Sequence, residues 1–121
     1  MLLSGSMAML MPDFSCEECV EIMTDAGFDG LDFPFFMKEF YVEECEGEAF
    51  QNRLRRLRAM AEEKGARFNQ AHAPEGSSIV DEEWTKRRFG EIVRSMKNAS
   101  ILGAGRLLAN AKNLQVIANK F

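Results

Sequence analysis

The stretch Lys64-Gly65-Ala66-Arg67-Phe68-Asn69-Gln70-Ala71-His72-Ala73-Pro74 decides the fold of this chain. An amphipathic segment ends at Gly65, the residue type that most readily takes the left-handed conformation that closes a helix. A short strand, 67–71, follows and ends beside His72, the only histidine of the sequence. Pro74 stops the strand because proline has no N–H to donate to a neighbouring strand. Helix, glycine, strand and polar loop in this order are typical of a βα-repeat protein.

The same order of helix, glycine and strand is predicted before and after this stretch. Glycines follow apolar helical patterns at Gly27, Gly65 and Gly103, so that both intervals, 65 − 27 and 103 − 65, are 38 residues. Equal spacing of one helix-to-strand junction indicates a repeated βα unit. Each unit needs its neighbours to cover its apolar face.

Outward from these junctions, the pattern predicts three βα units and a fourth strand. Ser15, with Glu18 three residues later, predicts the start of the first helix as a capping box. The third helix is expected to begin after Asp81 and to turn Phe89, Ile92, Val93, Met96 and Ala99 inward. Residues 35–47 read as a long loop that covers a site. The expected strands are 7–11, 30–33, 67–71 and 106–110, and the expected helices are 16–26, 48–64 and 82–102.

Strand–helix–strand crossovers of this length are right-handed and give a parallel sheet. An eight-stranded βα barrel needs roughly 250 residues, whereas this sequence has 121. We therefore expect an α/β fold, a partial (half) TIM barrel of about four strands with helices packed outside. Residues 1–121 form one domain in this interpretation, with a leader at 1–6, βα units at 7–104 and a divergent tail at 105–121. For 111–121 a short helix and a further strand remain equally open.

Charge and composition exclude some classes of function. A net charge of −4 argues against a nucleic-acid binder, because such proteins neutralise phosphates with lysine and arginine. No segment reaches the roughly 20 apolar residues of a membrane span. Three cysteines leave one thiol unpaired in any disulfide scheme, which favours a reducing, cytoplasmic compartment.

Candidate site residues stand where expected strands end. His72 could bind a divalent metal or move a proton, and Gln70 lies two residues earlier on the same strand face. Asp32 could ligate a metal or accept a hydrogen bond from a sugar hydroxyl. Phe33, with Phe35 and Phe36, could wall an apolar pocket. The alternatives are a histidine bonded near a loop, a solvated aspartate and ordinary core phenylalanines. No catalytic residue is assigned.

The motif Cys16-Glu17-Glu18-Cys19 has the spacing of a dithiol oxidoreductase at a helix start. Two adjacent carboxylates oppose thiolate formation. A dithiol redox protein using Cys16 and Cys19 is therefore the third-ranked hypothesis for function. The favoured interpretation of these two cysteines is that they only pack inside the helix or lie on its surface.

The pairing of Ala26-Gly27-Phe28-Asp29-Gly30-Leu31-Asp32 with Phe68-Asn69-Gln70-Ala71-His72-Ala73-Pro74 resembles the xylose isomerase-like TIM-barrel superfamily. This superfamily contains sugar phosphate isomerases and epimerases and the endonuclease IV type of apurinic endonuclease. The similarity covers roughly 7–104, and Ile101-Leu102-Gly103-Ala104 resembles the family's approach to its fourth strand.

The resemblance implies a sugar isomerase or epimerase that uses metal-assisted proton transfer on a small sugar or sugar phosphate. The metal would be a divalent cation, Zn, Mn or Mg. His72 matches the strand-three histidine that binds metal in the endonuclease branch and lines the pocket in many isomerases. Asp32 stands where the family often has glutamate.

The family's main metal ligands lie on strands five to eight, which have no counterpart in this sequence. We therefore expect a truncated barrel that is not active alone. The alternative is a non-catalytic βα scaffold, or self-assembling remnant, that forms a homo-oligomer through its exposed sheet edge.

Overall fold

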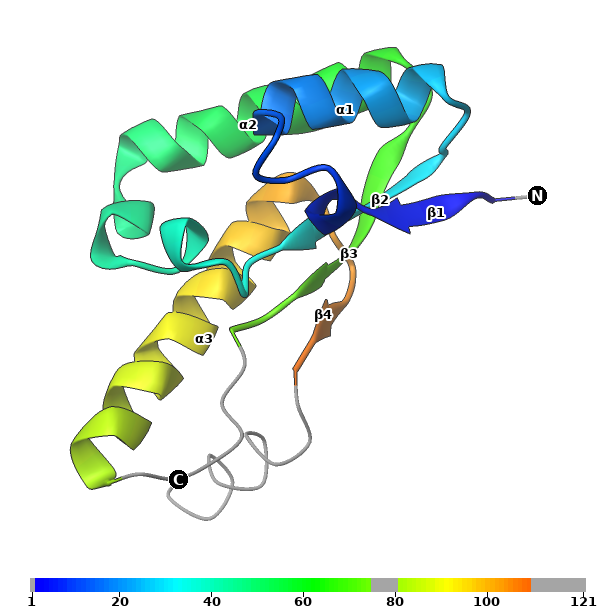
Figure 1. The fold of residues 1–121 in the computed structure, drawn as a ribbon. Coiled ribbons are helices and arrows are strands. Elements are labelled where there is room, and N and C mark those ends of the chain that lie inside the picture. Colours follow the sequence, from blue (N-terminus) through cyan, green and yellow to red (C-terminus); the bar gives the residue numbers. More distant parts are fainter. Residues whose placement is uncertain (1, 75–80, 110–121) are drawn as a thin grey trace.

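The computed structural model describes residues 2–74 and 81–109, which fold as alternating strands and helices (Figure 1). The four strands form one sheet in the order β1-β2-β3-β4, and each neighbouring pair is parallel. The predicted α/β fold with a parallel sheet of βα units is thus confirmed. The elements are β1 Ser4–Ser6, α1 Cys16–Asp25, β2 Gly30–Pro34, α2 Glu48–Glu63, β3 Arg67–His72, α3 Glu82–Leu102 and β4 Leu107–Leu108.

The predicted helix-to-strand junctions are present at all three glycines. Gly27, Gly65 and Gly103 have φ angles of +97°, +76° and +82°, the left-handed region that glycine enters without steric cost. Each junction turns the chain from a helix into the next strand. The capping box predicted at the start of α1 is also present, because Ser15 accepts from the Glu18 N–H and the Glu18 side chain accepts from the Ser15 N–H.

The first strand lies three residues earlier than predicted, at Ser4–Ser6, so residues expected to form a leader build the edge of the sheet. The Ser6 hydroxyl accepts from the Ala8 N–H and starts a 3₁₀ helix at Met7–Met9. This turn buries Met7 completely and leaves Met9 73% exposed. The apolar run 7–11 does not form the expected strand, because the Ser6 cap ends the extended chain before it.

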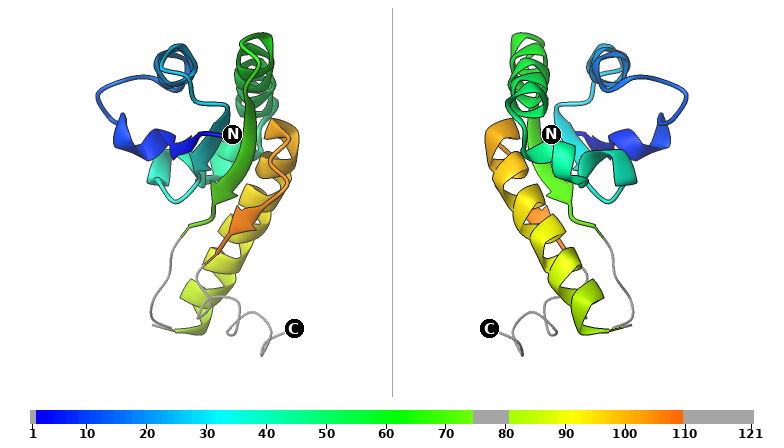
Figure 2. Two further views of the ribbon diagram at one scale, coloured as in Figure 1. Left: turned by 90° about the vertical axis from the view of Figure 1, so that its right-hand side faces the viewer. Right: turned by 90° about the vertical axis from the view of Figure 1, so that its left-hand side faces the viewer.

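All three helices contribute to one apolar core on one face of the sheet. Leu31 and Phe33 of β2 and Phe68 and Ala71 of β3 face this core. Consecutive strand order with right-handed crossovers places every helix on the same side, and Figure 2 shows the arrangement from two sides. The helices supply Cys16, Cys19, Val20, Met23, Leu54, Leu57, Ala61, Ala99 and Leu102.

The inward face of α3 is more polar than predicted. Ile92 and Ala99 are buried as expected, but Met96 is 56% exposed, and Ser95 and Asn98 are buried instead. The physical reason is that α3 packs against backbone carbonyl groups of the segment between β2 and α2. Asn98 Nδ2 donates to the Cys45 carbonyl oxygen at 3.0 Å, and Arg94 Nη1 donates to the Tyr41 carbonyl oxygen at 2.6 Å.

The segment between β2 and α2, predicted as a long loop, holds two short 3₁₀ helices, Lys38–Phe40 and Glu43–Glu46. The predicted fourth strand is short, Leu107–Leu108. The rest of the expected tail, 110–121, lies outside the described residues, as do 75–80. None of the helices in the described part of the chain is both long and apolar enough to cross a membrane.

Candidate functional site

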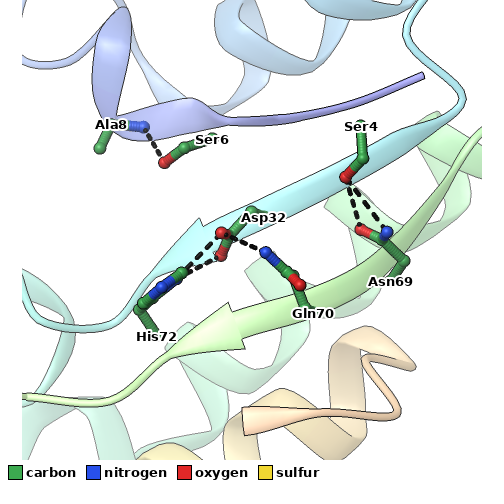
Figure 3. Close-up of polar contacts among 7 residues, drawn as sticks. All are labelled: Ser4, Ser6, Ala8, Asp32, Asn69, Gln70 and His72. Atoms are coloured by element: carbon green, nitrogen blue, oxygen red, sulfur yellow. Dashed lines mark hydrogen bonds and ion pairs between the residues drawn. The ribbon is translucent and has the colours of Figure 1, made fainter. Parts of the chain in front are cut away.

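Asp32, Gln70 and His72 form one hydrogen-bonded group at the carboxyl ends of β2 and β3 (Figure 3). His72 Nδ1 lies 2.9 Å from each carboxylate oxygen of Asp32. Gln70 Nε2 donates to Asp32 Oδ2 at 2.8 Å. In the sheet register Asp32 stands opposite Gln70, and Pro34 stands opposite His72. The sequence predicted Asp32, Gln70 and His72 as site residues, and the structure brings all three together.

A β-bulge in β3 aims Gln70 and His72 at Asp32. The register shifts by one residue, because Leu31 pairs with Phe68 but Asp32 pairs with Gln70. Strict alternation would put Phe68, Gln70 and His72 on one face. Instead Phe68 and Ala71 face the core, while Gln70 and His72 face Asp32. The extra residue is Asn69, and bulges commonly re-aim side chains in this way.

The burial of Asp32 sets the chemistry of the histidine. Asp32 is 4% exposed, and a buried carboxylate must be hydrogen-bonded to avoid a large desolvation cost. The His72 ring meets this need by donating its Nδ1–H, which leaves the Nε2 lone pair of the neutral ring available. The His72 side chain is 38% exposed. Its Nε2 has no hydrogen-bond partner within residues 2–74 and 81–109, so it can accept a proton or donate its lone pair to a ligand.

The phenylalanines near the site divide between core and rim. Phe33, predicted to contact substrate, is fully buried against Phe35, Phe40 and Phe68, with ring centroids 4.5, 4.9 and 6.1 Å away. It lies on the helix-covered face of β2, opposite Asp32. Phe36 instead lies beside His72, with centroids 6.4 Å apart and the rings nearly perpendicular. Phe36 is therefore the aromatic side chain of this group that reaches the site.

A second polar contact on the same face was not found by sequence reasoning. Asn69 reaches across β2 to Ser4 on β1, with distances of 3.1 and 3.2 Å between the amide atoms and Ser4 Oγ (Figure 3). It passes over Gly30, where an added Cβ would lie 2.9 Å from Asn69 Nδ2. The small residues Ser4 and Gly30 are the only sequence feature that could have indicated this contact. No residue pattern around Asn69 predicts the bulge that turns its side chain toward them.

The described residues do not form a complete metal site. Among residues 2–74 and 81–109, no three histidine, cysteine, aspartate or glutamate side chains lie close enough together to hold a metal ion. His72 Nε2 is one nitrogen donor, while both oxygens of Asp32 already contact His72 or Gln70. A metal at this position would need further ligands from outside this part of the chain.

The geometry around Cys16 and Cys19 opposes dithiol chemistry. Both thiols are free and buried. Burial raises the pKa of Cys16 to about 11, although Arg53 acts in the opposite direction. Burial and the neighbouring Glu18 also raise the pKa of Cys19. A reactive thiolate needs a lowered pKa and access to solvent, so the third hypothesis has no support from this arrangement.

No protein-family model matches this chain, and no curated protein matches it. The resemblance to the xylose isomerase-like superfamily therefore stays a prediction based on the quoted residues.

Proposed function

We propose that this chain is part of a sugar isomerase- or epimerase-like βα barrel, in which Asp32 and His72 carry proton transfer on a small sugar or sugar phosphate. The observation that carries the proposal is the contact between His72 Nδ1 and both oxygens of Asp32. The pair lies at the carboxyl ends of adjacent parallel strands. This is the edge at which βα proteins of both barrel and open-sheet type bind their ligands.

The topology supports a half barrel over an open, doubly wound sheet. In doubly wound folds the strand order reverses at a switch point and helices cover both faces. Here the order is consecutive, and the helices of the described residues share one core. Four strands do not close a barrel, so the remaining strands would come from a second copy or another segment.

The proton transfer follows from the roles of the three side chains. His72 Nε2 takes a proton from a carbon next to a carbonyl group, so that the C–H bond breaks and an N–H bond forms. The electron pair of the C–H bond forms a C=C bond, and the π pair of the carbonyl group moves to its oxygen, which gives an enediolate. Asp32 stabilises the imidazolium, as a carboxylate does for a catalytic histidine, and Gln70 holds Asp32 in place. Isomerisation is complete when His72 returns the proton to the neighbouring carbon and the hydroxyl proton moves to the former carbonyl oxygen. Epimerisation needs the proton on the opposite face of the same carbon, so the intermediate must turn over in the site before His72 returns it.

The divalent metal implied by the resemblance is not accounted for by the described residues. They supply one donor, His72 Nε2, and a metal there would compete with the proton for the same lone pair. The proposal therefore assigns proton transfer to His72 and leaves any metal ligands to the remaining strands.

Hydrogen–deuterium exchange tests the proposed function. Aldoses, ketoses and their phosphates are incubated with the protein in D₂O, with and without Zn²⁺, Mn²⁺ or Mg²⁺, and loss of the C–H signal next to the carbonyl is followed by NMR. We expect His72→Gln to slow the exchange by about 10²–10⁴-fold, the usual contribution of a general base. Glu63→Gln, on the exposed side of α2, is the matched control. Exchange above buffer at equal rates in wild type and His72→Gln would refute the proposal. Absence of exchange by a metal-loaded dimer, in which the second copy supplies the missing strands, would refute it as well.

A self-assembling scaffold is the second candidate, favoured by the exposed apolar residues at both sheet edges. Leu3 precedes β1 and Leu108 belongs to β4, and these side chains are 45% and 43% exposed. In the described part of the chain, β1 and β4 each have one unpaired side, a surface that favours strand addition. Molecular mass and metal content measured on one sample separate the two functions. A metal-loaded dimer supports the enzyme, and a metal-free oligomer supports the scaffold.

A further inference from the structure

We infer that this chain assembles head to tail, with the acidic side of one copy packed against the basic side of a second copy. The acidic side lies on α1, and the basic side lies on α3 and the turn into β4. The two sides are at opposite ends of the helix layer, because α2 packs between α1 and α3 (Figure 2). The inference rests on the proposed function only in that a second copy takes part. The two sides consist of Glu18, Glu21, Ile22 and Asp25 (acidic side) and of Met96, Lys97, Ser100, Gly103 and Arg106 (basic side).

Charge is segregated along this chain. Residues 1–37 contain seven carboxylates and no lysine, arginine or histidine, whereas residues 92–121 contain five lysines and arginines and no carboxylate. All four charged residues of α1 are acidic. On the basic side, the side chains of Lys97 and Arg106 are exposed and make no hydrogen bond or ion pair within residues 2–74 and 81–109. Protein interfaces pair surfaces of opposite potential, so each side of this molecule matches the other side of a second copy.

The basic side contains an open groove between α3 and the start of β4. Its volume is about 320 Å³, and glycine, alanine and serine supply most of its lining, among them Ala99, Ser100 and Gly103. Small residues leave room for a bulky side chain of another molecule. Met96 also lines the groove, and it is 56% exposed although it is a large apolar residue. Arg106 belongs to the same lining, so the groove offers apolar contact beside a positive charge.

Ile22 on the acidic side has the complementary character. Glu17 marks the flank of α1 that faces α2, because its carboxylate binds Arg53. Ile22 comes five residues later, about 140° around a helix of 3.6 residues per turn, and thus lies on the flank turned away from α2. It is 38% exposed. Glu18 and Asp25 are its neighbours at i−4 and i+3, so an apolar side chain stands here beside negative charges.

The occupant of each side is a second copy of this chain, because the two sides complement each other in charge and in the size of their apolar groups. Contact between two acidic sides or two basic sides would instead bring like charges together. Contact between two different sides is heterologous, so the assembly either closes into a ring or grows into a filament. In both cases a charge reversal on either side weakens the same contact.

Sedimentation velocity of the full chain over a range of concentrations tests this inference. We expect wild type to associate, and Glu21→Lys and Lys97→Glu each to weaken association by about tenfold or more, because each places like charges across the contact. An equimolar mixture of the two variants should associate like wild type, since the reversed charges then face each other. Both positions are exposed. Glu63→Lys, the same reversal at an exposed position of α2, is the matched control and should associate normally.

A variant without a change of charge tests the apolar part of the contact. Ile22→Ala should weaken association about tenfold, because a partly exposed isoleucine no longer enters the groove. Circular dichroism shows whether each variant is folded. The inference is overturned if wild type stays monomeric at every concentration, if folded Glu21→Lys and Lys97→Glu both associate normally, or if their mixture does not recover.

The inference and the proposed function fail in different ways. Sugar exchange that depends on His72 in a protein that sediments as a monomer would overturn the inference and leave the proposed proton transfer standing. Assembly that the two charge reversals disrupt and their mixture restores, in a metal-loaded protein without sugar exchange, would do the reverse.

Discussion

The carboxylate of Asp32 on β2 holds the ring of His72 on β3, with both of its oxygens 2.9 Å from Nδ1. The two residues are 40 positions apart in the chain, and the parallel pairing of their strands makes them neighbours. The pair fixes which ring nitrogen carries the proton when the imidazole is neutral. This is the property on which the proposed proton transfer depends.

Replacing Asp32 should change the tautomer of His72. In the wild type we expect the neutral ring to carry its proton on Nδ1, because Asp32 accepts it there. Asp32→Leu removes that acceptor, so the proton should move to Nε2. Because the sequence contains one histidine, two-bond ¹H–¹⁵N spectra above the titration range of the ring report this change without assignment. The exposed Asp13 supplies the control, Asp13→Leu, and an identical tautomer in Asp32→Leu and wild type would contradict the geometry.

Two glycine-to-alanine changes should affect stability with opposite signs. Gly65 has φ +76° and open space around its missing Cβ, so Gly65→Ala costs only the left-handed backbone, about 1–2 kcal/mol. Gly90 lies inside α3 and also has open space there. Gly90→Ala should therefore stabilise the fold by about 0.5–1 kcal/mol through helix propensity. Urea unfolding measures both values. A stabilising Gly65→Ala would show that the junction at Gly65 is not as described, and a destabilising Gly90→Ala would contradict the open space at Gly90.

The ion pair between Glu17 and Arg53 should make stability depend on pH in acid. Arg53 Nε and Nη2 each donate to a Glu17 oxygen at 2.9 Å, and these bonds lower the pKa of Glu17 below its usual 4.5. Its contribution is therefore present above pH 4.5 and is lost as pH falls through the lower folded-state value.

Glu17→Gln should flatten the acid limb of the stability curve, measured by urea unfolding at a series of pH values. Because both side chains are 36% exposed, salt should weaken the effect. Glu63→Gln, which removes an exposed carboxylate of α2, should leave the acid limb steep. Equal slopes in wild type and Glu17→Gln would speak against the pair.

Cys16 should make the fold less stable in alkali. Burial raises its pKa from 9.0 to about 11, so the unfolded chain ionises first as the pH rises. The contribution of the neutral thiol is complete below pH 9 and is lost between pH 9 and about 11. Cys16→Ala should remove this loss, although it costs stability at neutral pH by leaving a cavity.

Thiol reactivity checks the same residue independently. Alkylation of Cys16 by iodoacetamide at neutral pH should be slow in the folded protein and fast in urea. Mass spectrometry of the modified peptide gives both rates. Rapid alkylation of the folded protein would reopen the dithiol hypothesis.

The features that the sequence predicted well are local or follow from topology. The left-handed conformations at Gly27, Gly65 and Gly103 and the cap at Ser15 depend on a few adjacent residues. The proximity of Asp32 and His72 followed from a simple rule, since adjacent parallel strands bring their carboxyl ends to one edge. Both kinds of prediction needed no knowledge of side-chain packing.

The features that the sequence did not predict depend on contacts between distant segments. The polar inward face of α3 exists because Asn98 and Arg94 meet carbonyl groups of residues 41–46, which no helical periodicity reveals. Phe33 and Phe36 are similar residues separated by a turn after Pro34 that sends one into the core and the other to His72. The strand expected at 7–11 failed because apolar content alone does not distinguish a strand from a buried turn.

The bulge at Asn69 has a consequence for any comparison of this chain with a relative. Beyond the bulge, the inward and outward positions of β3 are exchanged relative to an uninterrupted strand. A homologue without the extra residue would carry its histidine one position closer to the preceding helix. An alignment that opens no gap at Asn69 would then match that histidine with Ala71, a core residue, and would miss the site.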